Sequence, residues 1–315
     1  MLRRLGRLGQ LGRLGRRTLS AGTDGYTRPE LLVEPDELQA ALADDTSDTV
    51  CIDCSALEAY RRAHIPGAVR LPADIYLKEP ATKSPGYLGR LLGGAAVEGL
   101  CASLGVGATT RVVAYDDTNG LAAARLWWVL QYYGLPSCSI LNGGWNRWCT
   151  ERRDIDFHAT RPRAQPHSGA PFAATAGSGA VAMAAVEDEE GGLAFDGSVQ
   201  WLDARSGGEV AGTDLRGNPR GGRLPGAAHV EWTSLVTGDD RRVFKSAAQI
   251  REIVEQAGID LSPGAPRIAT YCQGGIRAAH VAFALRLVGA EDVANFDGSF
   301  GQYSRLPEAE APLWL

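Results

Sequence analysis

Two hydrophobic patterns alternate along the chain. Short apolar runs, such as those at 111–115 and 267–271, are typical of strands that are covered on both faces. Longer segments between them carry apolar residues at helical spacing, as at 278–288. This alternation predicts an α/β fold in which each sheet is mostly parallel and is covered by helices on both faces.

The same order of segments occurs twice. The first half contains VCIDCS (50–55), HIPGA (64–68), RVVAYDD (111–117) and LNGGW (141–145). The second half contains QWLDAR (200–205), RLPGA (223–227), RIATYCQ (267–273) and FDGSF (296–300). Self-similarity of this kind predicts two copies of one module, at 24–155 and 181–315. The segment between them, 156–180, is rich in Pro, Gly, Ala and Ser and is predicted to be a linker.

One cysteine stands where a strand becomes a helix in the second copy. The strand at 267–271 leads into Cys272, two glycines follow, and a helix begins at about Arg277. The first amides of a helix lack partners and carry the positive end of its dipole, and glycines let a loop close around an anion. Helix N-termini and nearby cations lower a cysteine pKa from about 8.5 to roughly 3.5–7.5. We therefore expect Cys272 to be a reactive thiolate, and the alternative is an inert buried cysteine.

The first copy differs at this position. It has Asp116 where the second copy has Cys272, and its loop is one residue longer. A carboxylate cannot replace a thiolate as a soft nucleophile. We therefore expect the first module to be catalytically inactive and to form one wall of a cleft between the modules.

Together these motifs resemble the tandem rhodanese family of sulfurtransferases. The resemblance rests on the Asp that ends the first strand, the (H/R)-(I/L)-P-G-A segment, the single loop cysteine of the second copy and the closing D-G-S-F segment, and it extends from about Leu31 to Trp314. It implies two tandem rhodanese-like domains, of which only the second is active. The loop C-Q-G-G-I-R-A is most similar to that of bacterial-type thiosulfate sulfurtransferases.

The resemblance also implies a reaction. Cys272 would take the outer sulfur of thiosulfate, release sulfite and hold a persulfide until cyanide, a small thiol or a thioredoxin-like protein accepts the sulfur. No metal or organic cofactor is implied. The residues that follow the cysteine would form the substrate-binding loop: Gln273, Gly274, Gly275 and Ile276.

An anionic sulfur donor needs fixed positive charge near the thiolate. Arg277 is the nearest cation in the sequence, and Arg205 and Arg223 are further candidates for substrate binding. The second copy also has an insertion between its Asp and Pro-Gly segments that brings Arg216 and Arg220, and this insertion can reach the cleft. Each of these arginines could equally be a solvated surface charge.

Two positions depart from the better-known animal members of the family. Those proteins carry an arginine where this chain has Glu209, and a lysine or serine where it has Gly274. The donor therefore stays open between thiosulfate and 3-mercaptopyruvate. The missing cations also leave open a persulfide carrier or interaction protein without appreciable turnover.

Other classes of chemistry are weaker alternatives. Phosphatase loops place one more residue between cysteine and arginine than the four at 273–276. A cysteine protease needs a paired histidine, and His280 lies further along the same helix, where packing is its expected role. Cys51 and Cys54 form a Cys-x-x-Cys, but no second pair or histidine partner follows. We assign them, with Cys101, Cys138 and Cys149, to the structure.

The N-terminal segment at 1–22 has a different composition from the rest. It holds six arginines, no acidic residue and leucines at regular spacing, as in organelle transit peptides. We expect import into the mitochondrial matrix, with a plastid as the second choice. The formal net charge of −5 becomes more negative without this segment, which argues against nucleic acid as a partner. No apolar run is long enough to predict a membrane span.

Overall fold

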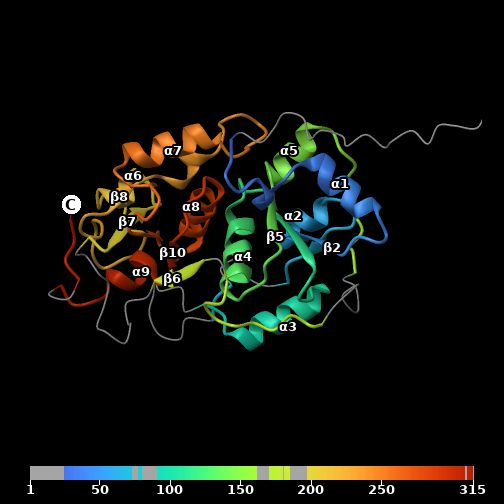
Figure 1. Cartoon of the computed structure of the whole chain (residues 1–315), viewed down its shortest axis with the longest axis horizontal. Helices are drawn as coiled ribbons and strands as arrows, with labels where there is room; N and C mark the ends of the chain where they lie inside the picture. The colour runs from blue at the N-terminus through green and yellow to red at the C-terminus, as the bar shows by residue number, and fades with distance from the viewer. Residues whose placement is uncertain are drawn as a thin grey trace, which may run out of the picture.

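A computed structural model describes residues 25–72, 77–79, 91–161, 170–179, 181–184, 197–308 and 311–314. The predicted transit peptide at 1–22 and part of the predicted linker lie outside these residues. The described chain forms two sheets, each flanked by helices, and the two halves lie side by side (Figure 1). None of the described helices is long and apolar enough to cross a lipid bilayer.

The first half contains a five-stranded parallel sheet. Its strands, in spatial order, are β1 (Leu32–Val33), β5 (Cys138–Leu141), β4 (Arg111–Tyr115), β2 (Thr49–Asp53) and β3 (Val69–Arg70). Its helices are η1 (Pro29–Leu31), α1 (Pro35–Ala43), α2 (Leu57–Arg62), α3 (Gly94–Leu104), α4 (Leu121–Tyr132) and α5 (Gly144–Thr150).

The second half repeats this arrangement. Its strands, in spatial order, are β6 (Ala182–Ala184), β10 (Val293–Phe296), β9 (Arg267–Tyr271), β7 (Val199–Asp203) and β8 (Ala228–His229). Its helices are α6 (Gly207–Val210), η2 (Trp232–Leu235), α7 (Ala247–Gln256), α8 (Ile276–Leu287) and α9 (Ser299–Tyr303). Both sheets are parallel and share one strand order, which confirms the predicted α/β fold and the internal repeat.

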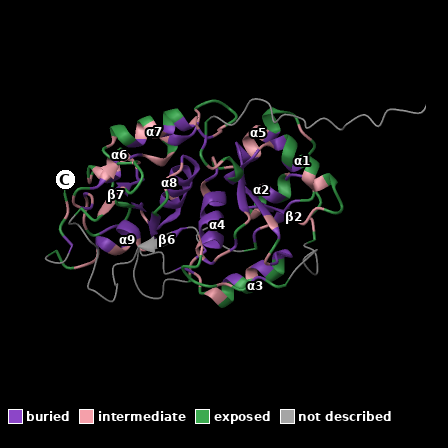
Figure 2. Ribbon diagram, viewed as in Figure 1, coloured by how far each residue is buried: buried purple, intermediate pink, exposed green. Residues whose placement is uncertain are grey.

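Both faces of each sheet are buried, as the continuous apolar runs predicted. Along β4, Val112 and Ala114 belong to the large core that extends through both halves, whereas Val113 and Tyr115 belong to a smaller core beneath α1 and α5. The second sheet has the same division, with its outer core beneath α9. Buried residues consequently concentrate in the strands and the two central helices (Figure 2).

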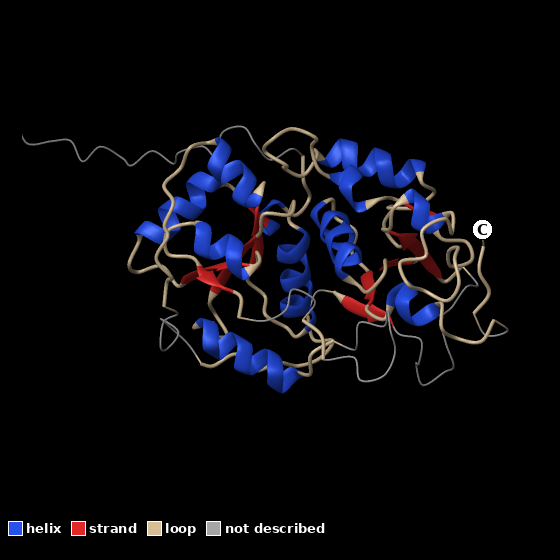
Figure 3. Ribbon diagram, turned by 180° about the vertical axis from the view of Figure 1, so that it is seen from behind, coloured by secondary structure: helices blue, strands red, loops and turns tan. Residues whose placement is uncertain are grey.

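The two halves meet along α4 and α8, which pack against each other in the middle of the molecule (Figures 1 and 3). Trp127 of α4 meets Phe283 of α8 edge to face, with ring centroids 5.0 Å apart. Both side chains are fully buried. Helices that are apolar on nearly every side suit this position, because each covers its own sheet and the opposite helix.

Local sequence signals explain where the helices begin. Ser246 and Gln249 form the predicted capping box at the start of α7. Gly120 and Gly275 precede α4 and α8 with φ angles of 82° and 83°, a left-handed conformation that favours glycine. Helix α8 begins at Ile276, one residue earlier than predicted.

Replacing the interface tryptophan tests how strongly the two halves depend on each other. Trp127→Ala is expected to lower the free energy of unfolding by about 3–5 kcal/mol, because it leaves a cavity between α4 and α8. The matched control is Phe157→Ala, since Phe157 is 60% exposed and its removal should change stability by about 0.5 kcal/mol or less. Urea unfolding of both variants measures the difference, and equal effects would contradict this account of the interface.

Candidate active site

The Cys272 loop lies at the carboxyl edge of the second sheet. Cys272 directly follows β9, the loop closes through Gly274 and Gly275, and α8 begins at Ile276. The Gly275 N–H donates a hydrogen bond to Cys272 Sγ at 3.2 Å. A Cβ on Gly275 would lie 3.2 Å from the Asp297 carbonyl oxygen, so glycine fits this turn both in conformation and in space. The loop thus has the predicted form, with amides directed at the sulfur.

The closing D-G-S-F segment holds the backbone of Cys272 in place. The Cys272 N–H donates to Ser299 Oγ at 3.2 Å, and the Phe300 N–H donates to the Cys272 carbonyl oxygen at 3.0 Å. Ser299 Oγ in turn donates to the Phe296 carbonyl oxygen at 2.6 Å. These contacts explain physically why that segment accompanies the cysteine loop.

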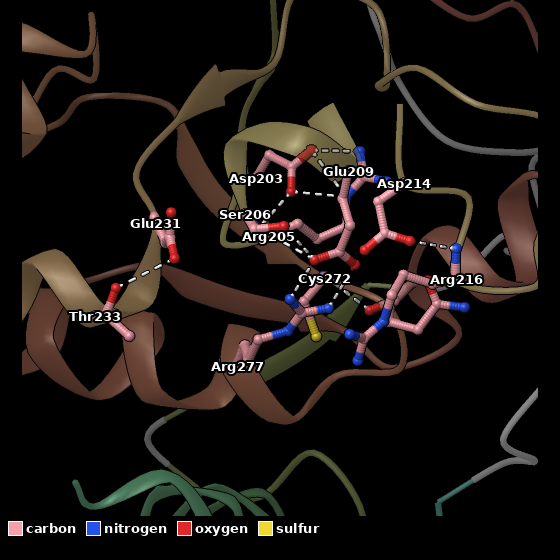
Figure 4. A network of polar contacts seen from close by, with 12 residues as sticks. Asp203, Arg205, Ser206, Glu209, Asp214, Arg216, Glu231, Thr233, Cys272 and Arg277 are labelled. Carbon is pink, nitrogen blue, oxygen red and sulfur yellow. Dashed lines mark hydrogen bonds and ion pairs between the residues drawn. The ribbon is translucent and has the colours of Figure 1, made fainter. Parts of the chain in front are cut away.

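Arg277 is the cation beside the sulfur, as the sequence predicted. It is the second residue of α8, and Figure 4 shows its guanidinium next to Cys272. Its Nη1 and Nη2 bind the two carboxylate oxygens of Glu209 at 2.6 and 2.8 Å. Glu209 lies in α6, which begins four residues after Asp203 as α2 begins four residues after Asp53, so it precedes the extra residues of the second copy.

The pKa of the Cys272 thiol is lowered despite its burial. Burial alone would raise it, but the charge of Arg277 and the amides of Ala278, Gly274 and Gly275 outweigh that effect. Glu209 is also buried, yet Arg277 and Ser206 lower its pKa to about 2. Arg277 therefore stabilises the charged forms of both the thiol and the carboxyl, and its own pKa is raised in turn.

The side chain of Gln273 binds the insertion at Asn218. Its amide exchanges two hydrogen bonds with the Asn218 amide, at 2.8 and 2.9 Å. Arg305 donates to the same Asn218 oxygen at 3.3 Å. The Gln273 side chain is therefore engaged with the insertion in this structure.

The structure gives Arg205 and Arg223 other partners. Arg205 is buried; its guanidinium binds the Asp203 carboxylate, with the shortest contact at 2.6 Å, and the Gly222 carbonyl oxygen at 2.8 Å. Arg223 pairs through its backbone with Trp314 and lines a cavity of about 570 Å³ that includes the start of β7. Because β7 and β9 run parallel, that start lies at the opposite edge of the sheet from Cys272. The Arg205 guanidinium, at the same edge as Cys272, is thus occupied by Asp203 and Gly222, whereas Arg223 lines the cavity at the far edge.

The two arginines of the insertion also differ in position. Arg220 donates to the carbonyl oxygens of Tyr303, Ser304, Leu306 and Ala311, and so fixes the chain that follows α9. Arg216 lies on the exposed turn after Asp214 (Figure 4). Asn218 of the insertion contacts the loop through the Gln273 side chain.

Two buried cations from the first half lie next to the Cys272 loop. The sequence analysis did not predict them. Arg125 of α4 binds Asp297 Oδ1 at 2.8 Å, and Lys78 binds Asp297 Oδ2 at 3.0 Å. Burial would raise the pKa of Asp297, but Arg125 and Lys78 lower it. Arg125 Nη1 also donates to the Gly275 carbonyl oxygen at 3.5 Å. Asp297 is the acidic residue of the D-G-S-F segment and directly follows β10. Its position after a buried strand was the sequence signal that could have indicated a buried ion pair.

The matching loop of the first half holds a carboxylate in the same nest. Asp116 follows β4, and its oxygens accept hydrogen bonds from the amides of Thr118, Gly120 and Ala123 at 2.7–2.9 Å. Burial nevertheless raises the pKa of Asp116, because these amides do not fully offset it. The second position of α4 is Ala122, where α8 has Arg277. The first copy therefore has the nest but lacks both the thiol and its cation.

The remaining cysteines and His280 have structural surroundings. Burial raises the pKa of Cys51 and Cys54 well above the ordinary thiol value, and that of Cys101 to about 12. Cys138 is also buried, whereas Cys149 is exposed at the end of α5, which the sequence did not predict. His280 is fully buried against Phe244 and Trp232, as expected of a packing residue.

Comparisons with known proteins agree with the repeat. The family model described as Rhodanese-like domain matches residues 34–151 and 192–306. A thiosulfate sulfurtransferase of Corynebacterium glutamicum is 30% identical over 89% of this chain and 90% of its own length. The sulfur carrier protein TtuD of Thermus thermophilus is 28% identical over 90% of this chain and 96% of its own length. The structure of SseA from Escherichia coli, a 3-mercaptopyruvate sulfurtransferase, is 26% identical, has a TM-score of 0.69 and covers 86% of this chain and 98% of its own.

A pH titration tests whether Arg277 stabilises the Cys272 thiolate. The ultraviolet absorbance of the thiolate, taken as the difference between the protein and its Cys272→Ser variant, should appear at a lower pH than for an ordinary cysteine. In the double variant Arg277→Gln, Glu209→Gln it should appear at a higher pH, because the cation is gone and no buried carboxylate is left unpaired. A titration that does not move would contradict the role of Arg277.

Proposed function

The chain belongs to the rhodanese family and is a sulfurtransferase with two rhodanese-like domains, and on this basis we propose that it transfers sulfane sulfur from thiosulfate through a persulfide on Cys272. Cyanide or a thiol is the proposed acceptor. The main support for the proposal is the environment of the Cys272 sulfur, which accepts a hydrogen bond from the Gly275 N–H at 3.2 Å and lies beside Arg277. The curated relatives named thiosulfate sulfurtransferase support thiosulfate as the donor.

The first half-reaction forms the persulfide. The Cys272 thiolate attacks the outer sulfur of thiosulfate, a new S–S bond forms, and the old S–S bond breaks with its electron pair leaving on sulfite. The terminal sulfur of the persulfide carries the negative charge. The same loop amides and Arg277 that favour the thiolate would stabilise this anion, since both charges lie at the N-terminus of α8.

The second half-reaction returns the enzyme to its starting state. Cyanide or a thiolate attacks the terminal sulfur, and the electron pair of the S–S bond returns to Cys272 Sγ. Thiocyanate or a new persulfide leaves. Because each step exchanges one sulfur bond for another, the cycle balances without an external oxidant or reductant.

Two alternatives have specific support. The structural similarity to SseA supports 3-mercaptopyruvate as the donor, and in that case pyruvate would leave in place of sulfite. The relative named as a sulfur carrier protein supports a persulfide that is passed to a protein partner with little turnover. The ratio of kcat/KM for thiosulfate and 3-mercaptopyruvate separates the two donors. Steady-state thiocyanate production from thiosulfate and cyanide would contradict the carrier alternative.

Removing the nucleophile is the first test of the proposed mechanism. Cys272→Ser is expected to abolish thiocyanate production from thiosulfate and cyanide, since a hydroxyl at this position cannot carry sulfane sulfur. Its folding should be unchanged, as measured by circular dichroism and urea unfolding. Cys149→Ser is the matched control, because Cys149 is the exposed free cysteine and should be dispensable. Substantial transfer by Cys272→Ser would contradict the mechanism.

A further inference from the structure

Glu209 occupies the position from which an anionic donor would be recognised. Its carboxylate takes both terminal nitrogens of Arg277, at 2.6 and 2.8 Å, and Arg277 is the cation beside the Cys272 sulfur. The Glu209 side chain is 2% exposed and that of Arg277 16%. The pair is thus an enclosed contact at the reacting sulfur (Figure 4).

The carboxylate is also held from its other side. The Ser206 N–H and Oγ both donate to Glu209 Oε2, at 3.2 and 2.9 Å, as parts of the capping box of α6. A carboxylate fixed by a capping box and a two-pronged arginine contact loses little entropy on pairing. Glu209 is therefore a built component of the site.

The charges around the sulfur show what this carboxylate does to the site. Arg277 is balanced by Glu209, and the two cations from the first half, Lys78 and Arg125, are both bound to Asp297. A donor that approaches Cys272 thus meets an arginine whose charge is already offset by a carboxylate. A donor with two negative charges is repelled more strongly by Glu209 than a donor with one.

We propose that Glu209 is a specificity-determining residue that discriminates between sulfur donors by charge and favours singly charged donors over doubly charged ones. This inference rests on the proposed persulfide chemistry of Cys272. The anionic end of the donor competes with Glu209 for the two outer nitrogens of Arg277. Glu209 then weakens the binding of thiosulfate, a dianion, more than the binding of a monoanionic sulfane-sulfur compound, and so lowers the preference for thiosulfate without excluding it as a donor.

Two probes isolate charge from reactivity. Thiosulfate and methanethiosulfonate both present an outer sulfur to the Cys272 thiolate, and they differ in that a methyl group replaces one charged oxygen. In each case the thiolate bonds to the outer sulfur, and the electron pair of the broken S–S bond leaves on sulfite or on methanesulfinate. The measured quantity is the ratio of kcat/KM for thiosulfate to that for methanethiosulfonate.

Glu209→Gln is the informative variant. Glutamine keeps the shape of the side chain and an oxygen that accepts from Ser206, so the capping box is retained. The ratio is expected to rise about fivefold or more, mainly through a lower KM for thiosulfate, because one repelling charge is removed close to the donor. Glu231→Gln is the matched control: Glu231 contacts Thr233 rather than Arg277, and its ratio should not change.

The outcomes separate this inference from the proposed function. An unchanged ratio in Glu209→Gln, or an equal rise in Glu231→Gln, would overturn the role of Glu209 while leaving the persulfide mechanism intact. If neither donor places sulfur on Cys272 of the unaltered protein, as read by peptide mass spectrometry, the proposed function itself fails and this inference fails with it.

Discussion

The site depends on one requirement: the protein must stabilise a negative charge in its interior, in the loop where β9 ends. The two copies of the module show what that charge requires. In the first, loop amides donate hydrogen bonds to Asp116, and burial still raises its pKa. In the second, Arg277 is added to a similar nest and the pKa of Cys272 is lowered. Backbone amides thus form the anion site in both halves. In the second half, the Arg277 side chain also shifts the protonation equilibrium of Cys272 toward the thiolate.

The Cys272 loop is built against the first half of the molecule. Helices α4 and α8 contact the opposite loops from matching positions. Arg125 of α4 reaches Gly275 and Asp297, and His280 of α8 reaches the Asn119 carbonyl oxygen at 3.1 Å. Asp297 binds cations from the first half on one side and belongs to the segment that clamps the Cys272 backbone on the other. The first half therefore positions the loop, although its own loop carries no thiol.

Local features could be predicted from the sequence, and contacts between distant segments could not. The strand before Cys272, the glycine turn, the capping box of α7 and the duplicated order of motifs follow from spacing and backbone preference. The partners of buried charges depend on tertiary packing. Glu209 was visible as a departure from the family pattern, but its pairing with Arg277 was not, and Lys78 and Arg125 lie far from Asp297 in the sequence. The pairing of Arg205 was equally hidden in the sequence: the arginine two residues after Asp203 folds back onto that carboxylate.

The most direct measurement of the central claim is the mass of the peptide that contains Cys272 after the protein is incubated with thiosulfate and the excess donor is removed. The account predicts a mass increase of one sulfur atom on this peptide, reversed by cyanide with formation of an equal amount of thiocyanate. An unmodified Cys272 peptide together with sustained thiocyanate production would contradict it, because sulfur would then be transferred without passing through the thiolate that the loop and Arg277 stabilise.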